Sequence, residues 1–293
     1  MRVAHIDTGR DMRGGQWQAL ALMTGLAERG LEQVLLAPAD APLFCKAREL
    51  GIAVAPVGLL SIWRARADVF HAHDARAHTL AAIAMRGPLV VSRRVAFAVK
   101  TGASSRWKYG RAEQYLAVSK FVEKTLLDAG VPAGKILVVY DGVAVPSMSM
   151  GERRQAMLAH PSKGRELIIQ AAAMARVDVQ FSTDLHADLP GAAAFVYISE
   201  SEGLGSAALL ALAHGVPVIA SSVGGLPEVV LHLETGLLTG NDPAQIAEAL
   251  RKLAGDPELA RRLGRSGLDL VESQFTTSHM VAGTVSVYER MLS

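Results

Sequence analysis

The sequence is poor in cysteine, in aromatic residues and in long apolar runs. Cys45 is the single cysteine, which excludes an intrachain disulfide and a cysteine-rich zinc site. Aromatic residues make up 5% and hydrophobic residues 50% of the chain, so we predict an aliphatic core of the kind found in α/β layers. No uninterrupted apolar run reaches about 18 residues, so no transmembrane helix is expected. The net charge of +2 is too small to indicate a nucleic-acid partner.

The length and the first residues narrow the class of protein further. A chain of 293 residues suits one large or two medium domains. The opening segment, MRVAHIDTGR, resembles a strand after one arginine rather than a signal peptide, so we expect a cytoplasmic protein.

Short apolar runs alternate with helical patterns along the whole chain. The first set of predicted strands covers residues 2–7, 33–38, 68–73, 88–94, 115–119 and 135–142. The second set covers residues 156–159, 177–182, 193–199 and 217–223, and helices are predicted at 14–30, 41–50, 163–175, 207–214, 227–233, 243–254 and 257–293. Strands that are apolar on both faces and separated by helices predict parallel sheets covered on both sides.

The polar segment 145–155 interrupts this alternation and is interpreted as the connection between two domains. The prediction is an α/β protein with two doubly wound domains, residues 1–147 and 148–275, facing each other across a cleft. A C-terminal helix, 276–293, would pack back on the first domain. The second domain is short, because only residues 177–192 separate the helix that ends near Ala175 from the strand at Ala193.

Two loops after predicted strands carry residues suited to a phosphorylated or hydroxylated ligand. Gly203 and Gly205 would let backbone amides at a helix start approach the ligand, and Glu202 would accept hydrogen bonds from sugar hydroxyls. Lys163, with Gly164 at another helix start, could reach a diphosphate. The alternatives are a glycine turn with an acidic cap and a solvated lysine.

The loop at residues 12–20, MRGGQWQAL, lacks the third glycine of a dinucleotide fingerprint, and no acidic residue ends the second strand. Both features disfavour a nicotinamide or flavin cofactor. The nearby repeat of glycines in 221–230, SSVGGLPEVV, is better explained as a capped helix after a turn.

The order and spacing of these segments resemble the retaining GT-B glycosyltransferases of family GT4. The resembling segments are RGGQWQALALMTGLAERG, DVFHAHDARAHTLA, YLAVSKFVEKTLLDAGVPAGKILVVYDGV, SKGRELIIQAA and SESEGLGSAALLALAHGVPVIASSVGGLPEVVLHLETGLL. PLVVSRRV and SSRWKYGRAEQYLAVS look most like bacterial members that build lipopolysaccharide core and related cell-surface glycans.

The resemblance implies a role for each matching position. It implies that Glu202 binds the donor sugar, that Lys163 neutralises the departing diphosphate, and that His73 lies near the donor or acceptor sugar. The backbone at Gly14, Gly15, Gly203, Leu204 and Gly205 would contact the donor. The donor would be a nucleotide diphosphate sugar, with no cofactor and no metal. Arg93 and Arg94 belong to a basic and aromatic stretch that would hold an anionic glycan or lipid-linked acceptor, or touch the inner face of the cytoplasmic membrane, unless it is a solvated charged face.

Two positions depart from the family pattern. Leu210 stands where a second glutamate usually binds the nucleotide ribose, and Leu158 stands where an arginine often contacts the diphosphate. Two other readings therefore stay open beside a lipopolysaccharide-type transferase: a GT-B binding or scaffolding relative without turnover, and a nucleotide-sugar epimerase of the same fold.

Overall fold

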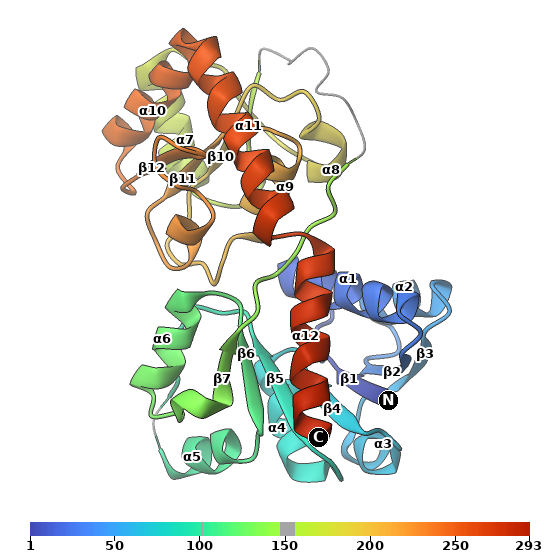
Figure 1. The fold of residues 1–293 in the computed structure, drawn as a ribbon. Helices are drawn as coiled ribbons and strands as arrows, with labels where there is room; N and C mark the ends of the chain where they lie inside the picture. The colour runs from blue at the N-terminus through green and yellow to red at the C-terminus, as the bar shows by residue number, and fades with distance from the viewer. Residues whose placement is uncertain (101, 147–155) are drawn as a thin grey trace. The chain divides into compact units, whose positions relative to one another are not determined.

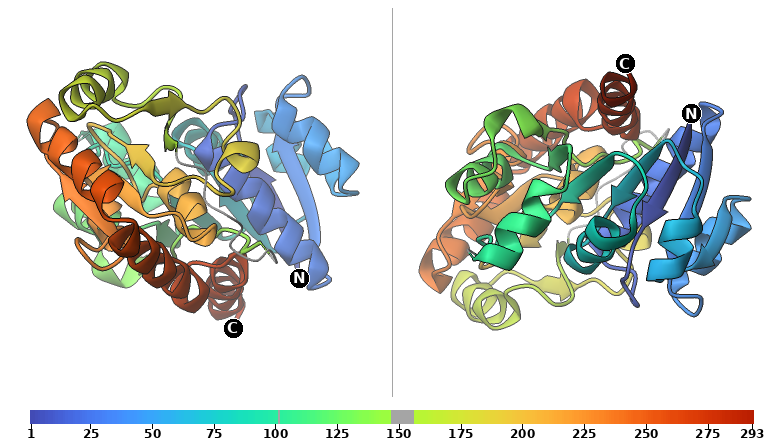
Figure 2. Two further views of the ribbon diagram at one scale, coloured as in Figure 1. Left: turned by 90° about the horizontal axis from the view of Figure 1, so that it is seen from above. Right: turned by 90° about the horizontal axis from the view of Figure 1, so that it is seen from below.

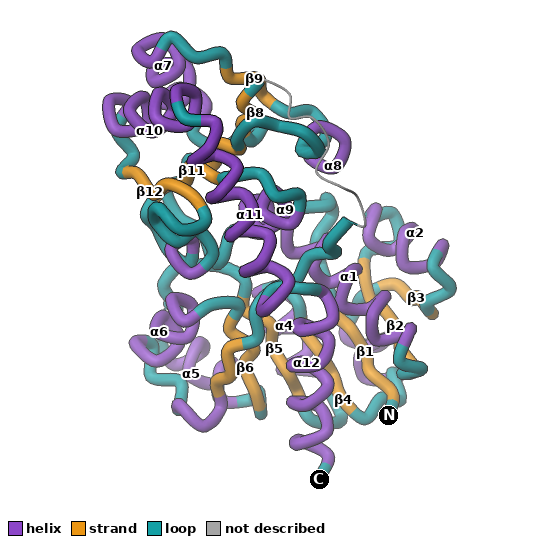
Figure 3. The backbone as a smooth tube through the Cα atoms, turned by 45° about the horizontal axis from the view of Figure 1, so that its top comes forward, coloured by secondary structure: helices purple, strands orange, loops and turns teal. Residues whose placement is uncertain are grey.

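The computed structural model describes residues 1–100, 102–146 and 156–293, and Figure 3 draws the remainder in grey. The chain forms two compact units. The first unit contains Met1–Gly142 and Thr277–Ser293, and the second contains Val143–Thr276. The predicted boundary between residues 147 and 148 lies outside the described residues.

The first unit is built on a seven-stranded parallel sheet in the order β3-β2-β1-β4-β5-β6-β7. Its strands are β1 (Arg2–Ile6), β2 (Glu32–Ala37), β3 (Ala53–Pro56), β4 (Val69–Ala72), β5 (Leu89–Arg93), β6 (Gln114–Ala117) and β7 (Ile136–Val138). Its helices are α1 (Gly14–Glu28), α2 (Pro42–Glu49), α3 (Leu59–Arg64), α4 (Ala75–Ala84), α5 (Ala103–Gly110), α6 (Lys120–Asp128) and α12 (Thr277–Leu292). The strand order reverses direction between β1 and β4, which is the usual place for a ligand in a doubly wound sheet.

One face of this sheet is covered by α1 together with α12. Val3, Val69 and Val90 project from the strands into one buried cluster with residues of both helices, among them Leu26 and Tyr288. Figure 1 shows α12 along the sheet, and the views of Figures 1 and 2 place both chain ends at the same end of this unit. The last helix is therefore a core element of the first unit.

The second unit contains a five-stranded parallel sheet in the order β12-β11-β10-β8-β9. Its strands are β8 (Met157–Ala159), β9 (Val179–Phe181), β10 (Phe195–Tyr197), β11 (Val218–Ser221) and β12 (Gly236–Thr239). Its helices are α7 (Arg165–Ala175), α8 (Leu185–Asp188), α9 (Ser206–Ala213), α10 (Pro243–Gly255) and α11 (Pro257–Gln274). In chain order this is a 2-1-3-4-5 sheet, so its direction reverses between β8 and β10.

Several predicted elements differ from the structure. The predicted helix at 227–233 is wrong, because only a 3-10 turn, Leu226–Glu228, forms there. The strands β3 and β12 were not predicted, and the predicted strand 135–142 ends at Val138. The segment 257–293 divides into two helices, because the helical bonding stops at Gln274 and begins again at Thr277.

Candidate functional site

In the second unit, Lys163 and Glu202 lie at the point where the sheet order reverses. Lys163 follows β8 and Glu202 follows β10, and these two strands are hydrogen-bonded neighbours. Loops that leave neighbouring parallel strands at a reversal open into the crevice where such sheets bind ligands. Lys163 Nζ donates a hydrogen bond of 2.7 Å to Glu202 Oε1. The structure thus brings together the two charged residues that the sequence singled out.

This ion pair is accessible to a ligand. The Lys163 side chain is 37% exposed and the Glu202 side chain 15%. A partly exposed ammonium can pair with phosphate oxygens, and a carboxylate beside it can accept hydrogen bonds from hydroxyl groups. The pair therefore has the chemistry needed to hold both ends of a sugar phosphate.

Helix α9 begins at Ser206, directly after the glycine-rich loop. Gly205 has a φ of 106°, and a Cβ there would lie 2.5 Å from Leu226 Cδ2, so packing as well as conformation requires glycine. Leu204 is 2% exposed, which limits any ligand contact at Leu204 to its backbone. The positive end of the α9 dipole points out of this loop toward the side of the sheet where Glu202 lies.

The loop after β11 packs tightly against the loop after β10, which carries Glu202. Gly225 N donates to Glu202 O at 3.1 Å. A Cβ on Gly224 would lie 1.9 Å from Glu202 O, and a Cβ on Gly225 would lie 2.2 Å from Gly203 O. Glycines at Gly224 and Gly225 therefore let the loop after β11 support the loop that carries Glu202.

In the first unit, the residues expected near a ligand also gather at the reversal of the sheet. Gly14 and Gly15 begin α1, which follows β1, and His73 follows β4. Arg94, just after β5, lies beside Gly15, since a Cβ built there would be 3.9 Å from Arg94 Cδ. Arg94 Nη1 also donates to His73 Nδ1 at 3.2 Å. Three predicted positions are thus in contact.

Arg93 and Arg94 are less accessible than expected, although Phe97 and Trp107 in the same stretch are exposed. Arg94 forms an ion pair of 2.9 Å with Asp141, and the two side chains are 9% and 8% exposed. Arg93 donates to Tyr109 OH at 2.9 Å and to the carbonyl oxygen of Phe97. Both guanidinium groups are engaged within the unit, so these two arginines of the stretch do not belong to a solvated charged face.

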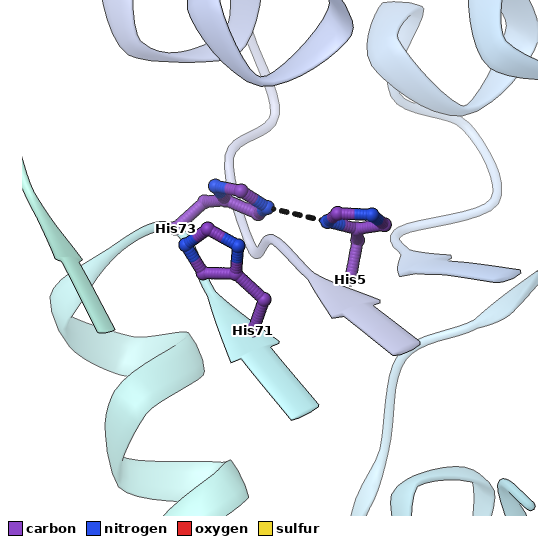
Figure 4. A group of neighbouring side chains, drawn as sticks. All are labelled: His5, His71 and His73. Atoms are coloured by element: carbon purple, nitrogen blue, oxygen red, sulfur yellow. Dashed lines mark hydrogen bonds between the residues drawn. The ribbon is translucent and has the colours of Figure 1, made fainter. Parts of the chain in front are cut away.

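Three histidines from β1 and β4 form a buried cluster (Figure 4). His5 and His71 are opposite each other in the strand register, and His73 follows directly after β4. His5 Nδ1 and His73 Nε2 are 2.9 Å apart, and His71 binds Tyr288 OH at 2.5 Å and Ser92 Oγ at 2.7 Å. Burial lowers the pKa of His5 to about 3, and it holds the pKa values of His71 and His73 well below their usual range, so all three are neutral near pH 7.

The protons of this cluster can be placed from Arg94. A guanidinium group only donates, so His73 Nδ1 must accept from Arg94. Neutral His73 then carries its proton on Nε2 and donates it to His5 Nδ1. His5 in turn donates from Nε2 to Gln33 Oε1, and Gln33 Nε2 donates to Met23 O. Both nitrogens of His73 are therefore occupied by protein partners.

Two family sequence patterns match successive parts of the chain. The glycosyl transferases group 1 pattern matches residues 160–269, and the Glycosyltransferase Family 4 pattern matches residues 12–145. The chain belongs to the GT4-type glycosyltransferases. This confirms the predicted enzyme family, and the group 1 match contains both Lys163 and Glu202.

Curated relatives resemble this GT4-type glycosyltransferase over a limited segment. The alpha-maltose-1-phosphate synthase of Mycolicibacterium smegmatis is 37% identical over 110 residues, and the D-inositol 3-phosphate glycosyltransferase of Streptomyces avermitilis is 42% identical over 98 residues. These segments cover 35% and 33% of the chain, and 28% and 21% of the relatives. The matches therefore span about a quarter of the length of these relatives.

Solved structures resemble the GT4-type chain along its whole length. The crystal structure of Anabaena HepE in complex with UDP has a TM-score of 0.85 at 16% identity, and covers 99% of this chain and 100% of its own. The lipopolysaccharide outer core galactosyltransferase WaaB in its apo form has a TM-score of 0.73 at 13% identity, with 99% and 100% covered. These likenesses confirm the predicted GT-B fold with two Rossmann-like domains.

The histidine cluster of the GT4-type chain is better explained as a hydrogen-bond network than as a metal site. Ring nitrogens of His5, His71 and His73 lie within 4.8 Å of one another, which is close enough to consider a cation. However, the nitrogens already bind Gln33, Ser92, Tyr288, Arg94 and each other. The positive charge of Arg94 against His73 also opposes a second cation.

Sequence reasoning missed the partners of both sites. Tyr197 and Ser199, at the end of β10, bind Glu202, and Asp141 binds Arg94. A second missed group is Asp7, fully buried after β1, whose carboxyl pKa is raised by burial and by Asp74. Tyr197 is the last residue of a strand, and Ser199, Asp7 and Asp141 each follow one, so a position at a strand end is the signal that could have revealed them. None of the helices in the described part of the chain is both long and apolar enough to cross a membrane.

Proposed function

We propose that this protein transfers a sugar from a nucleotide diphosphate sugar, with retention at the anomeric carbon, to lipopolysaccharide core or another cell-surface glycan. The observation that carries the proposal is the 2.7 Å contact of Lys163 with Glu202 at the reversal point of the second sheet. UDP sugars are the first donors to consider, because structures of Anabaena HepE, which shares the fold, contain UDP and UDP-glucose.

In the proposed reaction, the bond between the anomeric carbon and the diphosphate oxygen breaks, and an acceptor hydroxyl forms the new glycosidic bond. The hydroxyl proton leaves with the diphosphate, whose developing charge needs stabilisation. Lys163 and the amide groups at the start of α9 would supply it, and Glu202 would hold the sugar hydroxyls. The donor is a substrate, and the proposal includes no cofactor.

The first unit supplies the remaining proposed contacts. The amides of Gly14 and Gly15 at the start of α1 would approach the donor. His73 would lie near the sugar, but its ring nitrogens face Arg94 and His5, so we assign its contact to the ring edge or the backbone. Arg93 would serve the acceptor through its side chain, and Arg94, whose guanidinium group is already paired with Asp141 and His73, would serve it by shaping the same loop. A lipid-linked acceptor would place the reaction at the inner face of the cytoplasmic membrane.

Two observations favour a second candidate, a GT-B relative that binds nucleotide sugars without turnover. Leu210 is a half-buried residue of α9 and cannot accept the ribose hydrogen bonds that a glutamate there would make. Leu158, in β8, is 7% exposed and offers no charge to a diphosphate. Reduced donor affinity is the consequence expected from both residues.

A nucleotide-release assay tests the proposal. The protein is incubated with a panel of nucleotide diphosphate sugars and a lipopolysaccharide-core acceptor, and products are identified by mass and by the anomeric configuration. We expect diphosphate release with transfer, and at least a hundredfold loss in the Lys163→Ala variant. Lys124→Ala is the matched control, because Lys124 forms an exposed ion pair with Asp128 within helix α6 of the first unit.

Other outcomes would replace the proposal. Donor binding without release would identify the binding relative. Release of an isomerised nucleotide sugar would identify an epimerase, and a product with inverted configuration would refute retention.

A further inference from the structure

One oxygen of the Glu202 carboxylate accepts three hydrogen bonds. Lys163 Nζ donates to Oε1 at 2.7 Å, and Tyr197 OH donates to it at 2.8 Å. Ser199 Oγ donates to Oε1 at 3.0 Å and shares this proton with Ser201 O at 3.2 Å. No residue in the described ranges donates a hydrogen bond to Oε2. The protein therefore fixes one oxygen of this carboxylate and leaves the other for a ligand.

Two of the three donors are held rigidly. Tyr197 is the last residue of β10, is 4% exposed, and packs its ring against Phe195 and His160. Ser199 is 5% exposed, and its backbone is held from both sides, since its N–H donates to Ser221 Oγ at 2.9 Å and its carbonyl accepts from Asn241 Nδ2 at 3.0 Å. Neither donor can follow a ligand out of position.

Lys163 differs from these two donors. It lies in the loop between β8 and α7, its side chain is 37% exposed, and it carries a charge that a diphosphate would attract. An ammonium group has three N–H donors on a flexible stem and can share them between Glu202 and a phosphate. Any movement of Lys163 toward a diphosphate would weaken its hold on Glu202.

We infer that Tyr197 and Ser199 are positioning residues that keep Glu202 aimed at the donor sugar while Lys163 engages the diphosphate. The inference rests on the proposed function. It divides the site into a fixed part, which recognises the sugar through Oε2 of Glu202, and a movable cation, which responds to the leaving group. Tyr197 acts through Glu202 and does not itself contact the donor.

The Tyr197 hydroxyl suits this role at any working pH. Burial raises its pKa, and the neighbouring Glu202 charge and the hydrogen bond to it raise the pKa further, so the group stays protonated and donating.

The Tyr197→Phe variant tests the inference by comparing two ligands. UDP lacks the sugar and UDP-glucose carries it, so removal of the hydroxyl should weaken UDP-glucose binding about tenfold, the loss expected for a hydrogen bond to a charged group. UDP binding should stay unchanged. Calorimetry measures both. Equal weakening of both ligands, or unchanged UDP-glucose binding, would overturn the inference.

Tyr115→Phe is the matched control. Tyr115 is also a buried strand tyrosine, and its hydroxyl donates to the backbone oxygen of Tyr109 at 2.6 Å within the first unit rather than to a carboxylate. The control should bind both ligands as the wild type does. If it shows the same selective loss of UDP-glucose binding as Tyr197→Phe, the effect is general and the inference fails.

A ligand-free measurement separates this inference from the proposed function. Urea unfolding of Tyr197→Phe, Glu202→Ala and the double variant forms a mutant cycle. The tyrosine substitution should destabilise the wild type much more than the Glu202→Ala background, because the bond is already absent there. Additive effects of the two substitutions would overturn the inference that Tyr197 positions Glu202. Failure of the wild type to bind any nucleotide sugar would refute the proposed donor. The mutant cycle would still show whether Tyr197 and Glu202 are coupled.

Discussion

Arg94 and Asp141 form an ion pair of 2.9 Å in which each side chain is less than a tenth exposed. The same guanidinium group donates to His73, so one buried charge organises two residues that lie far apart in the sequence. Burial raises the pKa of Asp141, and the Arg94 charge opposes that rise. This buried ion pair therefore lies beside His73, near the point where the strand order of the first unit reverses.

Asp141→Asn should destabilise the protein strongly. The substitution leaves the Arg94 charge buried without its counterion, which costs about 3–5 kcal/mol in comparable cases. Asp128→Asn is the control, because it breaks the exposed pair with Lys124, where the expected cost is about 0–1 kcal/mol. Urea unfolding measures both. Similar losses in the two variants would contradict a special role for the buried pair.

Stability should fall below pH 6.5 partly through His5. Burial lowers its folded pKa to about 3, so between about pH 6.5 and 3 the unfolded chain binds a proton that the folded protein does not. The contribution is complete above pH 6.5, and by pH 5.5 about 1.4 kcal/mol of it is lost.

The test compares wild type with His5→Asn by urea unfolding at pH 7.5 and 5.5. The variant should lose less stability between these two pH values by about that amount. Asp7 and Asp141 have raised pKa values and act in the opposite direction, but they are present in both proteins and largely cancel in the comparison. An identical pH dependence in wild type and variant would show that His5 is not held neutral.

Gly224→Ala should displace the Glu202 loop. Gly224 has a φ of 57°, and its added Cβ would lie 1.9 Å from Glu202 O. Gly130→Ala is a matched control, since Gly130 has a φ of 81° with no atom within 4 Å of the added Cβ. The control should lose the conformational cost alone, about 1–2 kcal/mol.

The Gly224 variant should lose more stability than this and should also bind UDP-glucose more weakly. Unfolding curves and calorimetry give the two readouts. Equal stability losses with unchanged donor binding would mean that the loop after β11 does not support Glu202.

Leu210→Glu should tighten UDP binding about tenfold, because a carboxylate on α9 would accept the ribose hydroxyls that leucine cannot. Leu210→Met keeps the apolar character and a similar volume, and should leave the affinity unchanged. Calorimetry with UDP checks both variants. Unchanged or weaker binding to the glutamate variant would show that the ribose does not approach this part of α9.

The strand pattern of the sequence predicted the fold because the buried parallel strands are apolar on both faces. The runs that became β1, β4, β10 and β11 are of this kind. The strands Ala53–Pro56 and Gly236–Thr239 lie at the edges of their sheets, and they lack a fully buried apolar run, since the first is exposed at both ends and the second begins with a glycine. Each pairs with a single neighbouring strand. The helix predicted at 227–233 failed because its capping residues serve a turn packed beneath Glu202.

The candidate site was predictable in its positions but not in its contacts. Lys163 and Glu202 each follow a strand, so their approach follows from parallel topology. The pairing of His5 with His71 does not, because two further strands and three helices separate β1 from β4 in the sequence. The residues next to Tyr197 and Asp141 in the sequence do not indicate which charged side chain each of them contacts.

The place of α12 also bears on how the chain reaches its native state. Its buried residues Met280, Val281 and Val287 complete a core whose other members belong to β1, α1 and the strands next to them. During synthesis the whole stretch Val143–Thr276 therefore emerges before helix α12, which is needed to cover one face of the seven-stranded sheet. The first unit is thus the first to begin synthesis and the last to complete its core.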